Sequence, residues 1–174
     1  MRPGRWRIEA AVDVERWSTH DELLIVPRNV RIVNAPGVGT YKLGPMHIPR
    51  NFQTTYAAQL GVEGQPSAGR PLTVRAGYAY ETAAVPDAYL SVLTVDGAKH
   101  LFTGGLGYRF GTWTVDTVLG FATMPERHVD PAVGRVPQLN PIRDESAMPL
   151  TVFVNWGDYR SWWLIAGAGL SKQF

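Results

Sequence analysis

The feature that most constrains the fold is an alternation of apolar residues with polar or small ones, which recurs in six segments. Residues two apart lie on the same face of a strand, so each segment has one apolar face and one polar or small face. The segments span residues 6–17, 52–63, 72–81, 101–110, 113–122 and 159–174, and the first is expected to resume over 23–33. The alternation predicts an all-β protein of antiparallel strands.

The polar faces of these segments differ from the water-facing side of a soluble sheet. They carry mostly small residues with scattered Arg, Glu, Asp and Gln, rather than abundant Lys, Thr and Ser. Charges of both signs can pair across a wet lumen while the apolar face contacts lipid. Aromatic residues near segment ends, such as Trp6, Trp17 and Trp113, are typical of the headgroup level of a membrane. The pattern favours a transmembrane β-barrel, and the continuous apolar face argues against a small soluble lipid-binding barrel.

Composition argues against several other classes of protein. Hydrophobic residues make up 45% of the chain, yet no apolar run approaches the roughly 18 residues of a transmembrane helix. An aromatic content of 11% disfavours disorder. The net charge is +2 and the basic residues are scattered among acidic ones, which indicates no nucleic-acid partner. The chain has no Cys, so thiol chemistry and disulfides are excluded.

The connections between the segments alternate in length. Residues 34–51, 82–100 and 123–158 form long connections, whereas 64–71 and the turn near Gly111 are short. Transmembrane barrels have short periplasmic turns and long external loops, so the alternation predicts that Phe174 lies on the periplasmic side. The prolines of the last connection are expected to lie outside any hydrogen-bonded ladder; they are Pro125, Pro131, Pro137, Pro141 and Pro149.

Four landmarks occur in a characteristic order. They are VDVERWSTHDELL (12–24), LTVRAGYAYETAAVPD (72–87), GGLGYRF (104–110) followed by VDTVLGF (115–121), and a last strand that ends on Phe174. Together they resemble the C-terminal part of the long-chain fatty acid transporter family of Gram-negative outer membranes, the FadL and TodX group. Two positions depart from the family pattern: Ala84 stands in place of the usual Ser, and Lys172 replaces an aromatic or apolar residue that the barrel assembly machinery recognises.

The resemblance implies a barrel of about 14 strands, of which residues 1–174 would supply about six C-terminal ones. The signal peptide, the lumen-plugging hatch and the N-terminal strands would then be absent from this chain. The resemblance further implies passive uptake of long-chain fatty acids or other hydrophobic molecules through the lumen, without enzymatic activity or a cofactor. The expected location is integral to the bacterial outer membrane, and the expected partners are membrane lipids, the hydrophobic ligand and the assembly machinery.

Candidate site residues follow in two groups. The resemblance implies a cation for the ligand carboxylate before the second strand, and Lys42, His47 and Arg50 are the candidates there. The simpler interpretation of each is a solvated loop charge. A second group is predicted to face the lumen, where salt bridges that hold strand register are expected; it comprises Arg75, Glu81, Arg109 and Asp116, with Glu63 as a further partner.

Other chemistry has little support in the sequence. His20, His47, His100 and His128 lack the spacing of a metal site, so no metal is expected. Asp144 and Glu145 are expected to be solvated, and no nucleophile motif is present. Two alternatives stay open. One is a channel for aromatic hydrocarbons, and the other is an outer-membrane barrel enzyme acting on lipid, for which Ser146, His128 and Asp130 share one connection.

Overall fold

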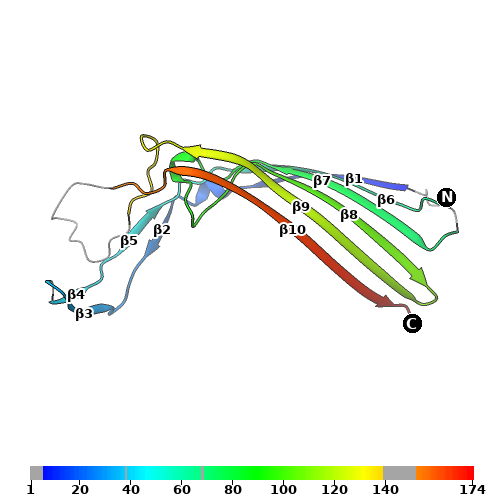
Figure 1. Ribbon diagram of the computed structural model, residues 1–174, viewed down its shortest axis with the longest axis horizontal. Coiled ribbons are helices and arrows are strands. Elements are labelled where there is room, and N and C mark those ends of the chain that lie inside the picture. The colour runs from blue at the N-terminus through cyan, green and yellow to red at the C-terminus, as the bar shows by residue number, and fades with distance from the viewer. Residues whose placement is uncertain (1–5, 38, 68, 139–151) are drawn as a thin grey trace.

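The computed structural model describes residues 6–37, 39–67, 69–138 and 152–174, and its main element is one antiparallel sheet (Figure 1). The order in the sheet is β1-β6-β7-β8-β9-β10, so each strand pairs with its neighbours in this series. The all-β antiparallel prediction is confirmed. Within the described residues the sheet is open, with β1 and β10 at its edges. The strands are β1 (Trp6–Glu15), β6 (Thr55–Gly64), β7 (Leu72–Glu81), β8 (Lys99–Phe110), β9 (Trp113–Val129) and β10 (Gly157–Lys172).

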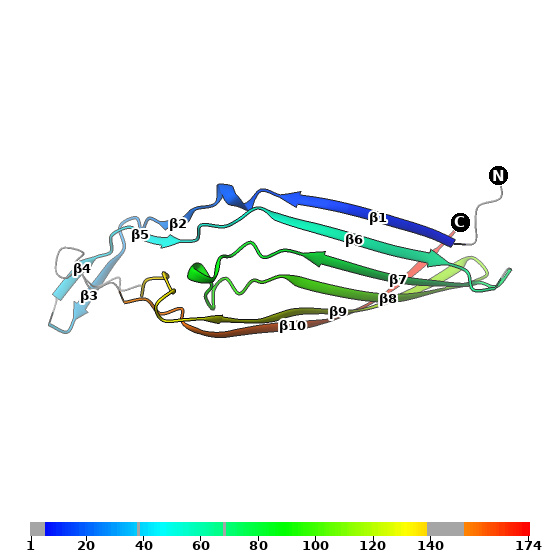
Figure 2. The same cartoon turned by 90° about the horizontal axis from the view of Figure 1, so that it is seen from above.

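The sheet has two ends of different character. At the end that we call the turn end, short turns join β6 to β7 and β8 to β9, and β1 begins and β10 finishes there. At the other end, the loop end, the three long connections leave and return (Figure 2). This arrangement agrees with the alternation of connection lengths in the sequence.

One face of the sheet is apolar and exposed along its whole length. Ile8 is 72% exposed, Leu119 69% and Leu164 74%, on three different strands. Tyr78 and Phe102 lie on the same face, with their ring centroids 5.2 Å apart. A continuous apolar surface of this extent marks contact with a membrane or with another protein. We call it the apolar face, and the opposite one the hollow face.

Strand β9 extends seven residues beyond the predicted end at Ala122 and contains Pro125. Pro125 therefore lies in a strand and not in a connection, but it has no partner in the β9–β10 register, as expected for a residue outside the ladder. The register against β10 shifts between Tyr159 and Ser161, where two residues of β9 oppose only Arg160. A bulge of this kind leaves backbone groups unpaired, so it accommodates a residue that has no N–H to donate.

The connection between β1 and β6 is an ordered projection and not a simple loop. After the short 3-10 turn η1 (Trp17–Thr19), β2 (Glu22–Ile25) pairs with β5 (Met46–Pro49), and β3 (Arg31–Ala35) pairs with β4 (Gly39–Lys42). We call residues 22–49 the arm. The first strand therefore does not resume over residues 23–33 as predicted, because these residues pair within the arm instead. Asn29, between β2 and β3, has a φ of +58°, so the chain turns there and residues 23–33 cannot form one strand.

Most of the buried side chains lie at the loop end, in the connections and in the strand ends beside them. Val85 and Leu90, from the connection between β7 and β8, pack on Val129 and Tyr159. The same connection contains the 3-10 turn η2 (Asp87–Tyr89). Asn155 is 2% exposed, and its Nδ2 donates to the carbonyls of Ala88 and Leu90, 2.9 Å from each. We call this packed region, residues 82–98 with 129–137 and 153–159, the cap.

In the described ranges, no helix has both the length and the apolar character needed to cross a membrane.

Candidate functional site

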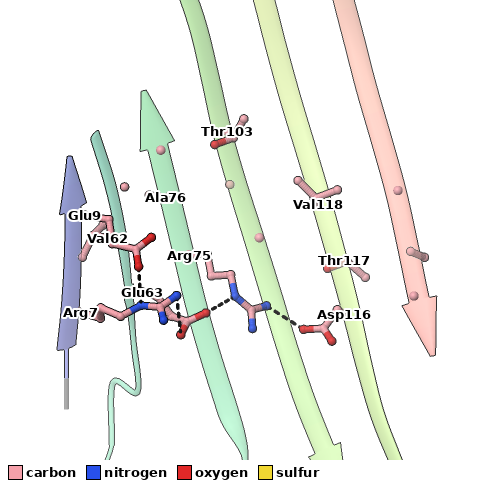
Figure 3. A pocket seen from close by; sticks show the side chains of 17 residues that line it. Arg7, Glu9, Val62, Glu63, Arg75, Ala76, Thr103, Asp116, Thr117 and Val118 are labelled. Atoms are coloured by element: carbon pink, nitrogen blue, oxygen red, sulfur yellow. Dashed lines mark hydrogen bonds and ion pairs between the residues drawn. The ribbon is translucent and has the colours of Figure 1, made fainter. Parts of the chain in front are cut away.

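The hollow face of the sheet carries a cavity of about 570 Å³, which reaches from β1 to β10 (Figure 3). Its lining contains six glycines and few large side chains, because small residues occupy the inward positions of β8 and β10. The glycines are Gly61, Gly77, Gly104, Gly105, Gly167 and Gly169. The larger polar side chains at this cavity belong to a row of charged residues.

This charge row crosses the sheet and alternates in sign. Arg7 on β1 lies 3.9 Å from the carboxylate of Glu63 on β6, which also accepts a hydrogen bond from Nε of Arg75 on β7 at 2.5 Å. Nη1 of Arg75 donates to Oδ1 of Asp116 on β9 at 2.7 Å. In Figure 3 these four side chains form a continuous series, and Arg75 is held between two carboxylates.

Arg75 reaches Asp116 because the intervening strand has glycines at the crossing. Neighbouring strands lie about 4.8 Å apart, so the pair spans roughly 10 Å from β7 to β9. A Cβ atom on Gly107 would lie 2.7 Å from Oδ1 of Asp116 and 3.1 Å from Nη1 of Arg75. A Cβ on Gly105 would lie 2.9 Å from the carbonyl oxygen of Thr117. Any side chain at Gly107 would therefore obstruct the ion pair.

Toward the loop end the hollow face becomes apolar. A second cavity of about 370 Å³ is lined by alanines, Leu101, Trp163 and Ile165. Lys99 and Glu81 bound it with an ion pair of 3.0 Å between Nζ and Oε1. Trp162 and Trp163 are adjacent on β10 and so point to opposite faces, Trp163 to the hollow one.

Three of the four residues predicted to face the lumen take part in these ion pairs. Arg75 and Asp116 belong to the charge row, and Glu81 pairs with Lys99. Arg109 follows the same alternation on β8, opposite Thr114 near the turn end, and has no ion pair among the described residues. The sequence prediction of lumen-facing charges missed Lys99, because residues 82–100 were assigned to a connection. Lys99 continues the alternation of Leu101 and Thr103 on β8, and this pattern could have identified it.

A third cavity, of about 220 Å³, lies at the loop end between the arm and the cap. We call it the loop-end pocket. Arg50 lines it, and its Nε is buried with no hydrogen-bond partner, the one such side-chain atom in the described residues. The guanidinium carbon of Arg50 lies 5.5 Å from the ring centroid of Phe52. Apolar side chains form most of the walls; they include Ile48, Pro49, Val92, Leu93 and Val154.

The other two candidates for a carboxylate-binding cation lie elsewhere on the arm. Lys42 ends β4 directly opposite Arg31, and Nδ1 of His47 lies 3.1 Å from Oε2 of Glu22. Neither residue lines the loop-end pocket. Of Lys42, His47 and Arg50, the structure therefore brings only Arg50 to an apolar cavity.

Polar contacts hold the cap to the sheet beside this pocket. Oδ2 of Asp96 accepts from the backbone N–H groups of Ala84 and Val85 at 2.6 and 3.1 Å, and Oδ1 accepts from Nζ of Lys99 at 2.8 Å. Burial opposes ionisation of Asp96, but the hydrogen bond and charge of Lys99, with the two amides, outweigh it and lower the pKa of Asp96 below its usual value of 3.8. Arg127 also clamps the cap, with Nε 2.9 Å from Oδ1 of Asp87.

The remaining candidates show no assembled chemistry. His128 pairs with Asp158, 2.6 Å from Nδ1 to Oδ1, at an exposed position across β9 and β10. Ser146, Asp144 and Glu145 lie outside the described residues, as do Pro141 and Pro149. No group of three or more His, Asp or Glu side chains with metal-binding geometry occurs in the part of the chain that the structure describes.

Long antiparallel strands with one apolar face and one hollow, charged face define a class of protein. They are typical of β-sheet membrane proteins, in which the apolar face contacts lipid and the polar face lines a lumen. The particular family follows from comparison with known proteins. A family model described as outer membrane protein transport protein (OMPP1/FadL/TodX) matches residues 3–136, and the chain belongs to this family. Membership implies outer-membrane transport of hydrophobic compounds. No curated protein matches the chain.

Proposed function

We propose that this protein passes long-chain fatty acids, or closely related hydrophobic molecules, across the bacterial outer membrane without covalent chemistry. The six-stranded sheet forms part of the wall of a larger barrel, its apolar face contacts lipid and its hollow face lines the lumen. Membership of an outer-membrane transport family supports the location and the general activity. The choice of ligand rests on the loop-end pocket.

The observation that favours an acid over a plain hydrocarbon is the position of Arg50. A buried guanidinium nitrogen without a partner carries a desolvation cost, which an anionic oxygen at hydrogen-bond distance would offset. Ile48, Val92 and Val154 surround it with apolar surface suited to an alkyl chain. At about 220 Å³ the pocket is smaller than a typical site for a whole ligand, so it holds the head and part of the chain.

The hollow face offers the next stage of the path. The cavity of about 370 Å³ near the loop end is apolar, and it precedes the charge row of Glu63, Arg75 and Asp116. An alkyl chain that leaves the loop-end pocket would contact Leu101, Trp163 and Ile165 first. The internal ion pairs hold strand register, and the two arginines and two carboxylates of the row balance in charge; Arg7 at its end also pairs with Glu9, 3.3 Å from Nε to Oε1.

Equilibrium binding of a long-chain fatty acid and of the alcohol of equal chain length tests the proposal. We expect Arg50→Ala to weaken binding of the acid by about 2 kcal/mol, or roughly 30-fold in Kd, because a charge-assisted hydrogen bond is lost. Binding of the alcohol should change little. The measurement is a titration of the folded protein in detergent with a fluorescent ligand and competing acid or alcohol.

Lys42→Ala and His47→Ala serve as controls, because both remove a basic residue of the arm that does not line the pocket. Equal loss in all three variants would show that the arm acts through general electrostatic attraction and not through Arg50. Tight binding of an aromatic hydrocarbon, with no binding of the acid, would instead favour the hydrocarbon channel. Turnover of lipid by the folded protein would support the enzyme alternative.

A further inference from the structure

The arm has an unusual distribution of charge. From residue 23 to residue 62 the chain contains no Asp or Glu but has four basic residues, Arg28, Arg31, Lys42 and Arg50. The first three are exposed and lie toward the tip of the arm, where β3 pairs with β4. Among the described residues, no carboxylate forms an ion pair with any of these three. Three of the basic residues that looked scattered in the sequence are therefore gathered on one projection of the structure.

Two of these cations face each other directly. Arg31 and Lys42 are partners in the β3–β4 register, so their side chains leave the same face of the ladder. Like charges at directly opposite positions destabilise a strand pair. An anionic group between Arg31 and Lys42 would remove this repulsion, and Arg28 lies only three residues before Arg31 in the chain.

Exposed aliphatic side chains accompany the cations. Leu24 is 47% exposed, Val26 55% and Val30 46%, so about half of each side chain is open to the surroundings. Figures 1 and 2 show the arm projecting beyond the loop end, and in Figure 1 it leaves at an angle to the strands of the main sheet. A surface that combines exposed aliphatic groups with unpaired cations fits a lipid surface with anionic headgroups better than a small soluble anion.

We propose that the tip of the arm docks on anionic, phosphate-bearing headgroups of the membrane surface around the barrel, with Arg31 and Lys42 clamping phosphate and Arg28 adding attraction. The aliphatic side chains of Leu24, Val26 and Val30 enter the headgroup layer beside them. This contact is separate from ligand binding at Arg50, and it rests on the membrane insertion proposed above.

A single fluorescent label on the arm tests this docking. The chain has no Cys, so Thr40→Cys, on the exposed surface of β4 two residues from Lys42, places one environment-sensitive dye at the tip. The protein is inserted into vesicles of phosphatidylcholine alone or with phosphatidylglycerol. We expect a blue-shifted, brighter emission only in the anionic vesicles, and its loss as salt is raised. Insertion is measured independently from the heat-dependent gel migration of the folded protein.

Arg31→Gln combined with Lys42→Gln should lower the ratio of docked to free arm by about 25-fold, since each cation near an anionic surface contributes about fivefold. Arg16→Gln combined with Arg160→Gln removes the same charge from the loop end outside the arm, from two exposed residues, and should leave docking unchanged. This matched pair separates a specific clamp from a general change in net charge.

Four results would overturn the inference. They are insertion with no change in emission, an equal change in neutral vesicles, an equal loss in both double variants, and the same change on adding inorganic phosphate to the protein in neutral vesicles. The last result would show a site for a soluble anion and not for a membrane surface. Failure to insert would overturn both this inference and the proposed membrane location, whereas insertion without docking leaves the transport proposal intact.

Discussion

At the scale of single residues, the hollow face depends on glycines as much as on charged side chains. Arg75 forms hydrogen bonds with Glu63 on the adjacent strand and with Asp116 two strands away. The second contact crosses Gly107, where even a methyl group would approach both partners too closely. The lack of a side chain at Gly107 thus determines which ion pair can form.

Gly107→Ala should lower the free energy of unfolding by about 1 kcal/mol, because the added Cβ separates Arg75 from Asp116 and crowds the floor of the cavity. The estimate is kept low because both partners are more than a third exposed, at 41% and 43%, and solvent screens their attraction. Gly104→Ala is the matched control on the apolar face, where a Cβ meets nothing within 4 Å. Urea unfolding of the protein in lipid vesicles measures both, and equal stabilities would contradict this account.

At the scale of elements, the cap and the arm distinguish this protein from a plain β-meander. The connection between β7 and β8 is anchored by Asp96 and Arg127, and Asn155 ties it to the segment before β10. Strand β9 is longer than its alternating pattern suggested because it pairs with β10 beyond a bulge at Pro125. These contacts place the apolar wall of the loop-end pocket against Arg50.

Protection of the cap amides from hydrogen exchange should depend on the ionisation of Asp96. The pKa of Asp96 is lowered in the folded protein, so the stability that Asp96 gives the cap is fully present above the usual pKa of 3.8. This stability is lost as the pH falls through the lowered pKa. We expect hydrogen exchange at the amides of Ala84 and Val85, corrected for intrinsic rates, to accelerate over this range. Asp96→Asn should weaken protection by about 2 kcal/mol at neutral pH and flatten its pH dependence.

Asp158→Asn is the control for this experiment, because it removes an exposed carboxylate from the last segment of the cap, which pairs with His128 and not with the connection between β7 and β8. A similar effect of Asp158→Asn on the amides of Ala84 and Val85 would show that the cap responds to loop-end charge in general. An unchanged pH profile in Asp96→Asn would remove Asp96 from the explanation.

At the scale of the whole molecule, the two faces of the sheet meet different surroundings. Leu119 and Val118 are adjacent on β9 and point to opposite faces, so they form a natural pair for comparison. Leu119 is 69% exposed on the apolar face, whereas Val118 lines the cavity of the hollow face. A sheet in lipid and a sheet in water respond differently to charges placed at these two positions.

Leu119→Arg should destabilise the inserted protein by about 2–4 kcal/mol, because a charge on the lipid-facing side of a barrel near the bilayer midplane must be desolvated. Val118→Arg should cost less, since a guanidinium on the hollow face stays hydrated. Urea titration of both variants in vesicles provides the comparison. Equal costs, or a larger cost for Val118→Arg, would argue against the assignment of the apolar face to lipid.

The local pattern of the sequence determined the fold class, the two faces and most of the strand positions. Alternation has a period of two residues and so needs no knowledge of what pairs with what. It was sufficient to place Arg75, Glu81 and Asp116 on the face where the structure finds them. It misjudged the C-terminal end of β9 and the course of residues 23–33, where a bulge and turns interrupt the period.

Only the tertiary structure decided which of these residues meet. Arg75 and Asp116 are 41 residues apart, and their contact depends on the register of three strands and on a glycine between them. The pocket at Arg50 combines the end of the arm with all three segments of the cap, which lie far along the chain. The gathering of Arg28, Arg31 and Lys42 likewise required the pairing of β3 with β4. These are long-range contacts, and a pattern that repeats every two residues contains no information about them.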